Sequence, residues 1–293
     1  MELAIAEILL PTDFSPRSAA AARYAVTLAR RFHSRLTLLH VQPPLNIAYE
    51  FPGVDAGLAE MLDGHKKQLR EELDSFLAQE LKQFEVTRVL AEGDPAQTII
   101  DYSRANKTDM IVTETRGTGV FRRLILGSVT AKVLHDAPCP VFTGVHAEQV
   151  AADKTWSLHH VLCAVDPASG DEAAIGWAVK LASAFEARLS VVHAIPAPPF
   201  HLQNYAIESE LRRLLGEGER ERIVKLLEAA GNPRDTEIHV QSGPVSKVVL
   251  SIAQDSRADV IVIGHGSEDE LPGRLHTNGY SIIRDSICPV ISV

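Results

Sequence analysis

The chain has 293 residues, enough for about two domains that can each bury a core. It carries 29 Lys and Arg against 38 Asp and Glu, a formal net charge of −9, which argues against a nucleic-acid partner. Three cysteines exclude a disulfide framework, and no apolar run reaches the ~18 residues that a membrane-spanning helix needs. Because the start lacks a signal-peptide pattern, we expect a cytoplasmic protein that does not insert into membranes.

The first half alternates short apolar runs with helical patterns. The opening helix should begin at Ser15-Pro16, where a favoured N-cap precedes a proline suited to the first turn. We predict helices from 15 to about 32, over 57–83, from 95 to about 106 and from 128 to about 136. We predict strands at 7–10, 36–41, 86–90, 110–113 and 141–144.

The second half repeats the first. Asp13 matches Asp166 and His40 matches His193 at an offset of 153 residues, so the chain holds two copies of one unit. The second set of strands is predicted near 161–165, 189–194, 236–240, 260–263 and 290–293. We predict domains over 1–146 and 158–293, joined by a polar linker over 147–157.

Nearly continuous apolar strands that alternate with helices predict a parallel sheet covered on both faces. With right-handed crossovers, each copy becomes a doubly wound α/β domain with five parallel strands, of the Rossmann type. Ligands of such sheets bind beyond the carboxyl ends of the strands, where the winding reverses. The residues after strands one, two and four of each copy are therefore the candidates for a site.

Pro11, Thr12 and Asp13 follow the first strand. The Asp13 carboxylate can accept hydrogen bonds from a ribose hydroxyl or an adenine amino group. The alternative is that it only holds the following turn. His40 and its counterpart His193 end the second strands, and we interpret both as structural, with a ligand role as the alternative.

After strand four, Thr113 and Glu114 lead into a loop with Gly117 and three arginines, and Gly127-Ser128 opens the next helix. Glycines let backbone N–H groups approach a phosphate, and a helix N-terminus attracts its charge. The alternatives are an ordinary N-cap for Ser128 and a solvated basic loop for the arginines.

The second copy departs from this pattern. It keeps Asp166 and has Gly264, but Ser267 stands in place of the loop glycine, and His276-Thr277 stands where Gly127-Ser128 lies. Its loop also holds three consecutive acidic residues, which repel phosphate. Asp166, His265 and His276 could instead form a metal site, the alternative being that the histidines are simply exposed.

The chain resembles the universal stress protein family in its tandem form. The resemblance covers nearly all of both copies and rests on PTDFS (11–15), LTLLHV (36–41), VLAEGDPAQTI (89–99), the RG…LILGSV loop (116–129) and KVLHDAPCPV (132–141). The family's ATP-binding signature is Gly-x2-Gly-x9-Gly-(Ser/Thr). Here Gly117, Gly127 and Ser128 match it, and Glu114 replaces its first glycine.

The resemblance implies ATP or a related adenine nucleotide in copy one, possibly bound with Mg²⁺, and a degenerate site in copy two. Asp13 would then meet adenine or ribose, Val41 would border the base, and Gly117, Gly127, Ser128 and Val129 would hold ribose and phosphates. A Glu114 carboxylate beside a triphosphate would cost about 1–4 kcal/mol. The resemblance also implies that the two copies pair through their fifth strands, and it leaves a homodimer open.

Three other functions stay open. Both pockets could have decayed, which would leave a pseudo-dimer scaffold for protein interactions. The second copy could hold a metal or small ligand. Slow ATP hydrolysis is the third, although the sequence has no Walker-type Gly-Lys-(Ser/Thr) and no carboxylate at the spacing expected of a general base.

Overall fold

The computed structural model describes residues 3–44, 56–115, 126–144, 156–167, 172–195, 205–232, 236–264 and 277–293. The strands of the first half are β1 (Glu7–Pro11), β2 (Arg35–Gln42), β3 (Val86–Glu92), β4 (Met110–Glu114) and β5 (Val141–Gly144). Those of the second half are β6 (His160–Ala164), β7 (Arg188–Ile195), β8 (Glu237–Ser242), β9 (Val260–Ile263) and β10 (Val290–Ser292). The helices are α1 (Pro16–Phe32), α3 (Ala56–Ser75), α4 (Pro95–Ala105), α5 (Ser128–Asp136), α6 (Glu172–Phe185), α7 (Tyr205–Ala229), α8 (Val245–Ser256) and α9 (Thr277–Asp285).

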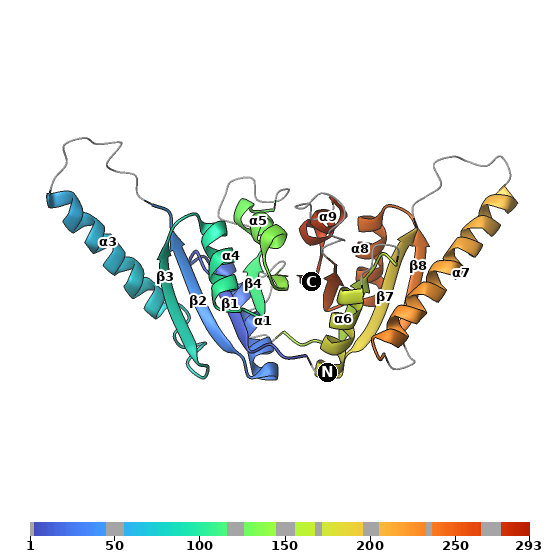
Figure 1. Ribbon diagram of the computed structural model, residues 1–293, viewed down its shortest axis with the longest axis horizontal. Helices are drawn as coiled ribbons and strands as arrows, with labels where there is room; N and C mark the ends of the chain where they lie inside the picture. Colours follow the sequence, from blue (N-terminus) through green and yellow to red (C-terminus); the bar gives the residue numbers. More distant parts are fainter. Residues whose placement is uncertain are drawn as a thin grey trace.

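The strands form one sheet in the order β3-β2-β1-β4-β5-β10-β9-β6-β7-β8. Strand neighbours run parallel except at the centre, where β5 and β10 are antiparallel and Phe142 faces Ile291. The predicted doubly wound α/β units are therefore confirmed, and they join edge to edge into a single mixed sheet. Figure 1 shows the two units side by side, with α3 and α7 at the outer ends.

Helices cover both faces of this sheet. The apolar face of α1 shares a core with Leu73 of α3, whereas Ile99 and Ile100 of α4 pack with Val133 and Leu134 of α5 in a second core. Nearly every central strand position is buried, because both faces are covered. Among the described helices, none has the length and apolar character needed to cross a membrane.

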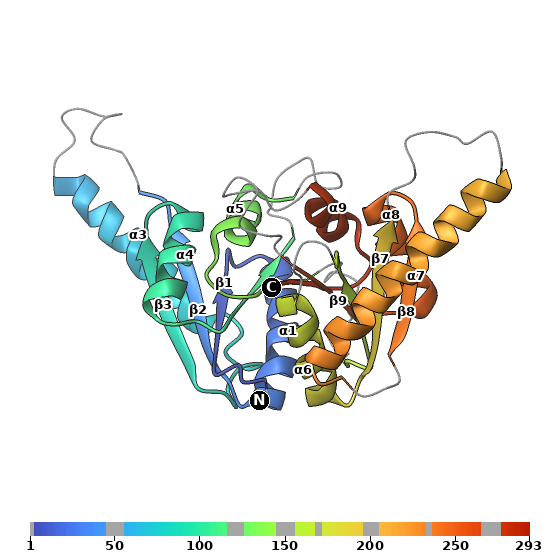
Figure 2. The same ribbon diagram turned by 45° about the vertical axis from the view of Figure 1, so that its right-hand side comes forward.

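The junction between the units is built from more than strand pairing. Tyr24, Phe142 and Trp156 form an aromatic cluster with ring centroids 5.2 to 5.7 Å apart. Phe32 of α1 meets Phe185 of α6 edge to face, and Figure 2 shows these two helices side by side. The predicted pairing through the fifth strands is thus present, with side chains of both units around it.

The second helix is shorter than the predicted span of 57–83. It ends at Ser75, and Leu77 adopts a left-handed φ of 54°. Arg88 of β3 donates hydrogen bonds to the carbonyls of Leu73 and Phe76, the latter at 2.8 Å, and so satisfies carbonyls that a longer helix would use. Leu73 and Leu81 lie on either side of this helix end, and both are buried.

Candidate functional site

The first unit reverses its winding between β1 and β4, which are parallel neighbours. Pro11 is the last residue of β1, and Thr113 and Glu114 end β4. Val41, one residue from the end of β2, is buried beside them in the sheet. The first unit thus places these four residues at the carboxyl edge where ligands of doubly wound sheets bind.

The loop after β1 is fixed by its own polar groups. Thr12 is buried, its N–H donates to Leu39 at 2.9 Å, and its hydroxyl accepts from the Phe14 N–H at 3.0 Å. Asp13 is exposed, and its Oδ1 accepts from the Ser15 N–H at 3.0 Å. The turn-holding role is therefore present, but it uses one of two carboxylate oxygens, so Asp13 can also accept from a ligand.

His40 holds this loop from the neighbouring strand. Its Nδ1 lies 2.8 Å from the Thr12 carbonyl oxygen, and its ring stacks on Phe14 with centroids 4.3 Å apart. In the second unit, His193 Nδ1 lies 2.9 Å from the carbonyl oxygen of Val165, which precedes Asp166. Both histidines contact the backbone just before the aspartate, which supports the structural interpretation of this repeated position.

Glu114 lies half-buried in the site. Its Oε2 is inaccessible to solvent and has no hydrogen-bond partner within the part of the chain that the structure describes. Burial first, and then repulsion by Asp13, raise the Glu114 pKa to about 8, while Arg17 acts in the opposite direction. Two carboxyl groups therefore face the same region from the ends of β1 and β4.

Helix α5 begins beside Glu114. The Thr130 hydroxyl donates to the Glu114 carbonyl at 2.9 Å, and the Gly127 N–H donates to Thr115 at 3.1 Å. Gly127 is the N-cap and no side chain caps the helix, so the predicted N-cap alternative for Ser128 is wrong. Ser128 and Val129 are exposed in the first turn, where backbone N–H groups lack helical partners and suit an anion.

Several predicted residues lie outside the described residues. These are Gly117, the loop arginines, His265, Ser267 and His276, as well as the side chain of Thr277. In the second unit, Asp166 follows β6 and Gly264 follows β9, in the register that Asp13 and Glu114 have in the first. Within the described ranges, no group of three or more His, Cys, Asp or Glu could hold a metal ion.

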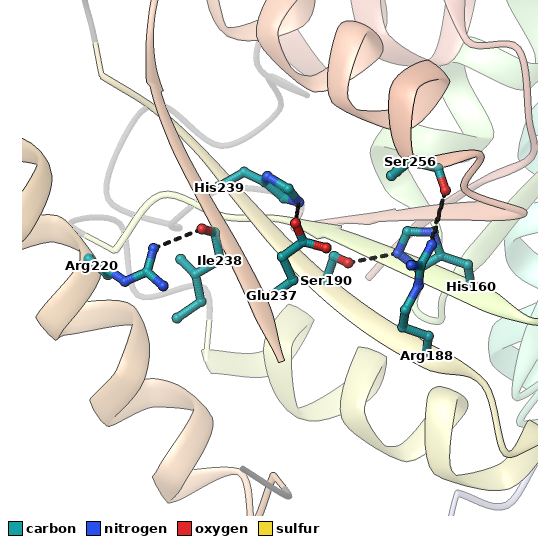
Figure 3. A network of polar contacts seen from close by, with 8 residues as sticks. All are labelled: His160, Arg188, Ser190, Arg220, Glu237, Ile238, His239 and Ser256. Atoms are coloured by element: carbon teal, nitrogen blue, oxygen red, sulfur yellow. Dashed lines mark hydrogen bonds and ion pairs between the residues drawn. The ribbon is translucent and has the colours of Figure 1, made fainter. Parts of the chain in front are cut away.

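A second polar cluster lies at the opposite end of the second unit's strands (Figure 3). His160 Nε2 is 2.7 Å from the Ser190 hydroxyl, and Arg188 donates to the Ser256 carbonyl at 3.1 Å. Burial, and then the Arg188 charge, lower the His160 pKa. The sequence pattern predicts no role for His160, which directly follows His159. Because His160 and Ser190 are almost fully buried, we interpret the cluster as structural.

Figure 3 also shows how the outer edge of the sheet is covered. Arg220 of α7 donates to the Ile238 carbonyl of β8 at 2.9 Å. Arg70 of α3 makes the equivalent contact with the Arg88 carbonyl of β3 at 3.4 Å. Edge strands expose unpaired backbone groups, so in each unit an arginine of the covering helix satisfies one of them.

A family profile and individual relatives point to the same protein family. The profile of the Universal stress protein family matches residues 5–143 and 157–293. A universal stress protein of Methanocaldococcus jannaschii is 32% identical over 141 residues, which cover 46% of this chain and 79% of that protein. One of Mycolicibacterium smegmatis is 29% identical over 189 residues, which cover 64% of this chain and 63% of that protein.

Solved structures share the tandem fold. A crystal structure of a functionally unknown protein from Pseudomonas aeruginosa covers 99% of this chain and 92% of its own, with 22% identity and a TM-score of 0.67. A universal stress protein from Archaeoglobus fulgidus covers 99% of this chain and 96% of its own, with 22% identity and a TM-score of 0.65. A universal stress protein solved in complex with cAMP covers 47% of this chain with a TM-score of 0.34, a likeness that says nothing about a ligand here.

Proposed function

The chain belongs to the universal stress protein family, and we propose that its first unit binds an adenine nucleotide at the carboxyl ends of β1 and β4. The observation that carries this proposal is the meeting of two recognition elements at one point. Asp13 offers a hydrogen-bond acceptor for adenine or ribose, and the uncapped start of α5 offers backbone donors for a phosphate.

The neighbouring groups support this use of the site. Thr12 and His40 fix the backbone before Asp13 through bonds of 2.9 and 2.8 Å, so the carboxylate is held in place before a ligand arrives. Val41 lies one residue before the end of β2, next to the site, and offers an apolar contact for a base. A preorganised acceptor costs less ordering on binding than a mobile one. The proposed ligand contacts are therefore Pro11, Thr12, Asp13, Val41, Thr113, Gly117, Gly127, Ser128 and Val129.

Asp166 provides a matched control for the test. We expect Asp13→Asn to weaken binding of adenosine and AMP by about tenfold in calorimetry, the effect of one good hydrogen bond to a charged group. Asp166→Asn should leave the same titration unchanged, because we propose that the second unit is the degenerate copy. Equal effects of the two substitutions would contradict the assignment to the first unit. Absence of any adenine-ligand binding by the unaltered chain would overturn the proposal.

A second candidate function is a covalent pseudo-dimer scaffold without a nucleotide. The observation that favours it is Glu114, whose half-buried carboxyl group at the end of β4 lies within reach of the Asp13 charge. The central β5–β10 pairing would then be the functional feature, because it holds two units in a fixed orientation. Adenine-ligand binding that appears only in a Glu114→Gly variant would support the scaffold.

A further inference from the structure

The two units meet through residues that occupy the same position in each copy of the repeat. Phe142 and Ile291 both lie two residues after a Cys-Pro-Val start, and in the antiparallel pairing of β5 with β10 they lie opposite each other. Phe32 ends α1 and Phe185 ends α6, and their rings meet with centroids 5.9 Å apart. A position that meets its own counterpart lies on a two-fold axis, so an approximate two-fold axis relates the units at the junction.

The helices beside these strands follow the same axis. α5 and α9 have nine residues each, and Figures 1 and 2 show them facing each other across the junction. Ala131 is the fourth residue of α5 and Tyr280 is the fourth residue of α9. The Tyr280 hydroxyl donates to the Ala131 carbonyl at 3.2 Å, and both side chains pack against one apolar cluster. The tyrosine therefore reaches across the junction to its own counterpart, which is an alanine.

At three positions on this axis, a larger side chain of one unit meets a smaller one of the other. The pairs are Tyr280 with Ala131, Phe142 with Ile291, and Arg31 with Ala184. Arg31 and Ala184 each lie one residue before the end of their helix, and the Arg31 Nε donates to the Ala184 carbonyl. The larger members come from both units, so the two surfaces are complementary to each other without being alike.

Pairing of two like units would bring identical side chains together at these positions. Two second units would place Tyr280 against another Tyr280, in space that the small side chain of Ala131 leaves free. Two first units would place Phe142 against another Phe142 in a fully buried part of the sheet, and they would leave a gap between two alanines. Overfilled and underfilled contacts both cost stability. Arg31 is exposed, so the repulsion of two such arginines adds little.

We propose that these axial residues make the junction specific for the pairing of unlike units. The surface that α1, β5 and α5 present fits the surface of α6, β10 and α9, in the same chain or in a second copy, and it does not fit a second first unit. Two chains that associate must therefore exchange whole units or use a different surface. This inference does not depend on the proposed nucleotide site.

Single substitutions in the full chain reproduce the contacts of like units. Tyr280→Ala gives the contact that two first units would make, and Ala131→Tyr gives the contact of two second units. The double variant restores one large and one small side chain with their places exchanged. Phe142→Ile and Ile291→Phe, singly and together, repeat the cycle at a second axial position. Lys132→Tyr is the matched control, because it adds a tyrosine to α5 at the exposed position next to Ala131.

Urea unfolding followed by circular dichroism measures all variants. We expect the urea midpoint to fall by about 0.5 M in Tyr280→Ala and in Ala131→Tyr, because one substitution empties the contact and the other overfills it. The double variant should return to within about 0.2 M of the unaltered chain, since neighbouring residues are not additive. The cycle at Phe142 and Ile291 should show the same recovery, and the control should stay within about 0.2 M.

Two results would overturn the inference. The first is a double variant whose loss equals the sum of the two single losses, because complementary volumes would then not matter. The second is an unchanged midpoint in the single variants, because contacts between like residues would then cost nothing. If Ala131→Tyr does not fold, the double variant decides: recovery of folding supports the inference and continued failure to fold overturns it.

Discussion

Replacing Glu114 by Gln should stabilise the ligand-free chain at high pH and leave it almost unchanged at low pH. The Glu114 pKa is raised from 4.5 to about 8 in the folded chain, by burial first and by Asp13 second. Between these two values the folded chain holds a proton that the unfolded chain has lost. The free energy of unfolding must therefore fall as the pH rises through this window and level off above it. Glutamine is neutral throughout, so the variant lacks this contribution.

The size of the effect follows from the pKa shift. Each pKa unit is worth about 1.36 kcal/mol, so the full shift corresponds to about 5 kcal/mol for a group shielded from water. Glu114 is only partly buried, and solvent reaching the carboxyl group reduces this to about 2 kcal/mol. We expect Glu114→Gln to exceed the unaltered chain by about 2 kcal/mol in unfolding free energy at pH 9, and by less than about 0.5 kcal/mol at pH 5.

Urea unfolding of both chains across pH 5 to 9, followed by circular dichroism, measures this difference. Glu92→Gln is the matched control, because Glu92 also ends a strand at this edge of the sheet but is exposed on β3. For that control, the curves of unfolding free energy against pH should be parallel in the variant and the unaltered chain. Parallel curves for Glu114→Gln as well would refute the argument, since they would mean that the Glu114 carboxyl group titrates alike in the folded and unfolded chains.

Three further substitutions test the rest of the structure by denaturant unfolding. Burial and Arg188 lower the His160 pKa, so the free energy of unfolding should fall as the pH drops below about 6.5. His160→Gln should flatten this loss between about pH 7.5 and 5.5. An equally steep loss in the variant would mean that His160 is not its cause. Gly144→Val should cost about 1–3 kcal/mol, because an added Cβ would lie 3.0 Å from Tyr24 Cε2, and a cost near zero would show that the ring moves freely. Phe142→Ala should cost about 3–5 kcal/mol, because this fully buried ring fills the junction between the units, and a much smaller loss would mean that the junction collapses around the gap.

The strands could be predicted because a strand covered on both faces is apolar along its length, and the repeat doubled every such signal. The end of α3 could not be predicted in this way. The apolar spacing continues from Leu73 to Leu81, and both side chains are buried. What ends the helix is Arg88, on a strand that follows later in the chain, through its bonds to the carbonyl of Leu73 in the last turn and that of Phe76 just beyond it. A cap supplied by tertiary structure leaves no local signal.

The candidate site likewise combines features that the sequence predicts with others that depend on tertiary contacts. The sequence indicates which residues follow β1 and β4, because these positions depend only on where apolar runs stop. It does not indicate where the Glu114 side chain points, since Asp13, Arg17 and the loop arginines are all within reach of a flexible carboxylate by spacing alone. The orientation toward Asp13 and Arg17 depends on the pairing of β4 with β1 and on how α1 packs over β4, both long-range features.

The contacts that fix the strands leading to Asp13 and Asp166 are nearly identical in the two units. The difference between the two sites is therefore local. Asp109 accepts from two consecutive backbone N–H groups at the start of β1, at 2.8 and 2.9 Å, and Asp259 does the same at the start of β6, at 2.7 and 2.9 Å. At the other end of these strands, His40 and His193 hold equivalent carbonyls. Because such bonds fix the backbone without involving the residue at 114 or 264, exchanging Glu and Gly between these positions should alter the site and leave the strand framework in place. The exchange therefore isolates the chemistry of one side chain within a framework that both units share.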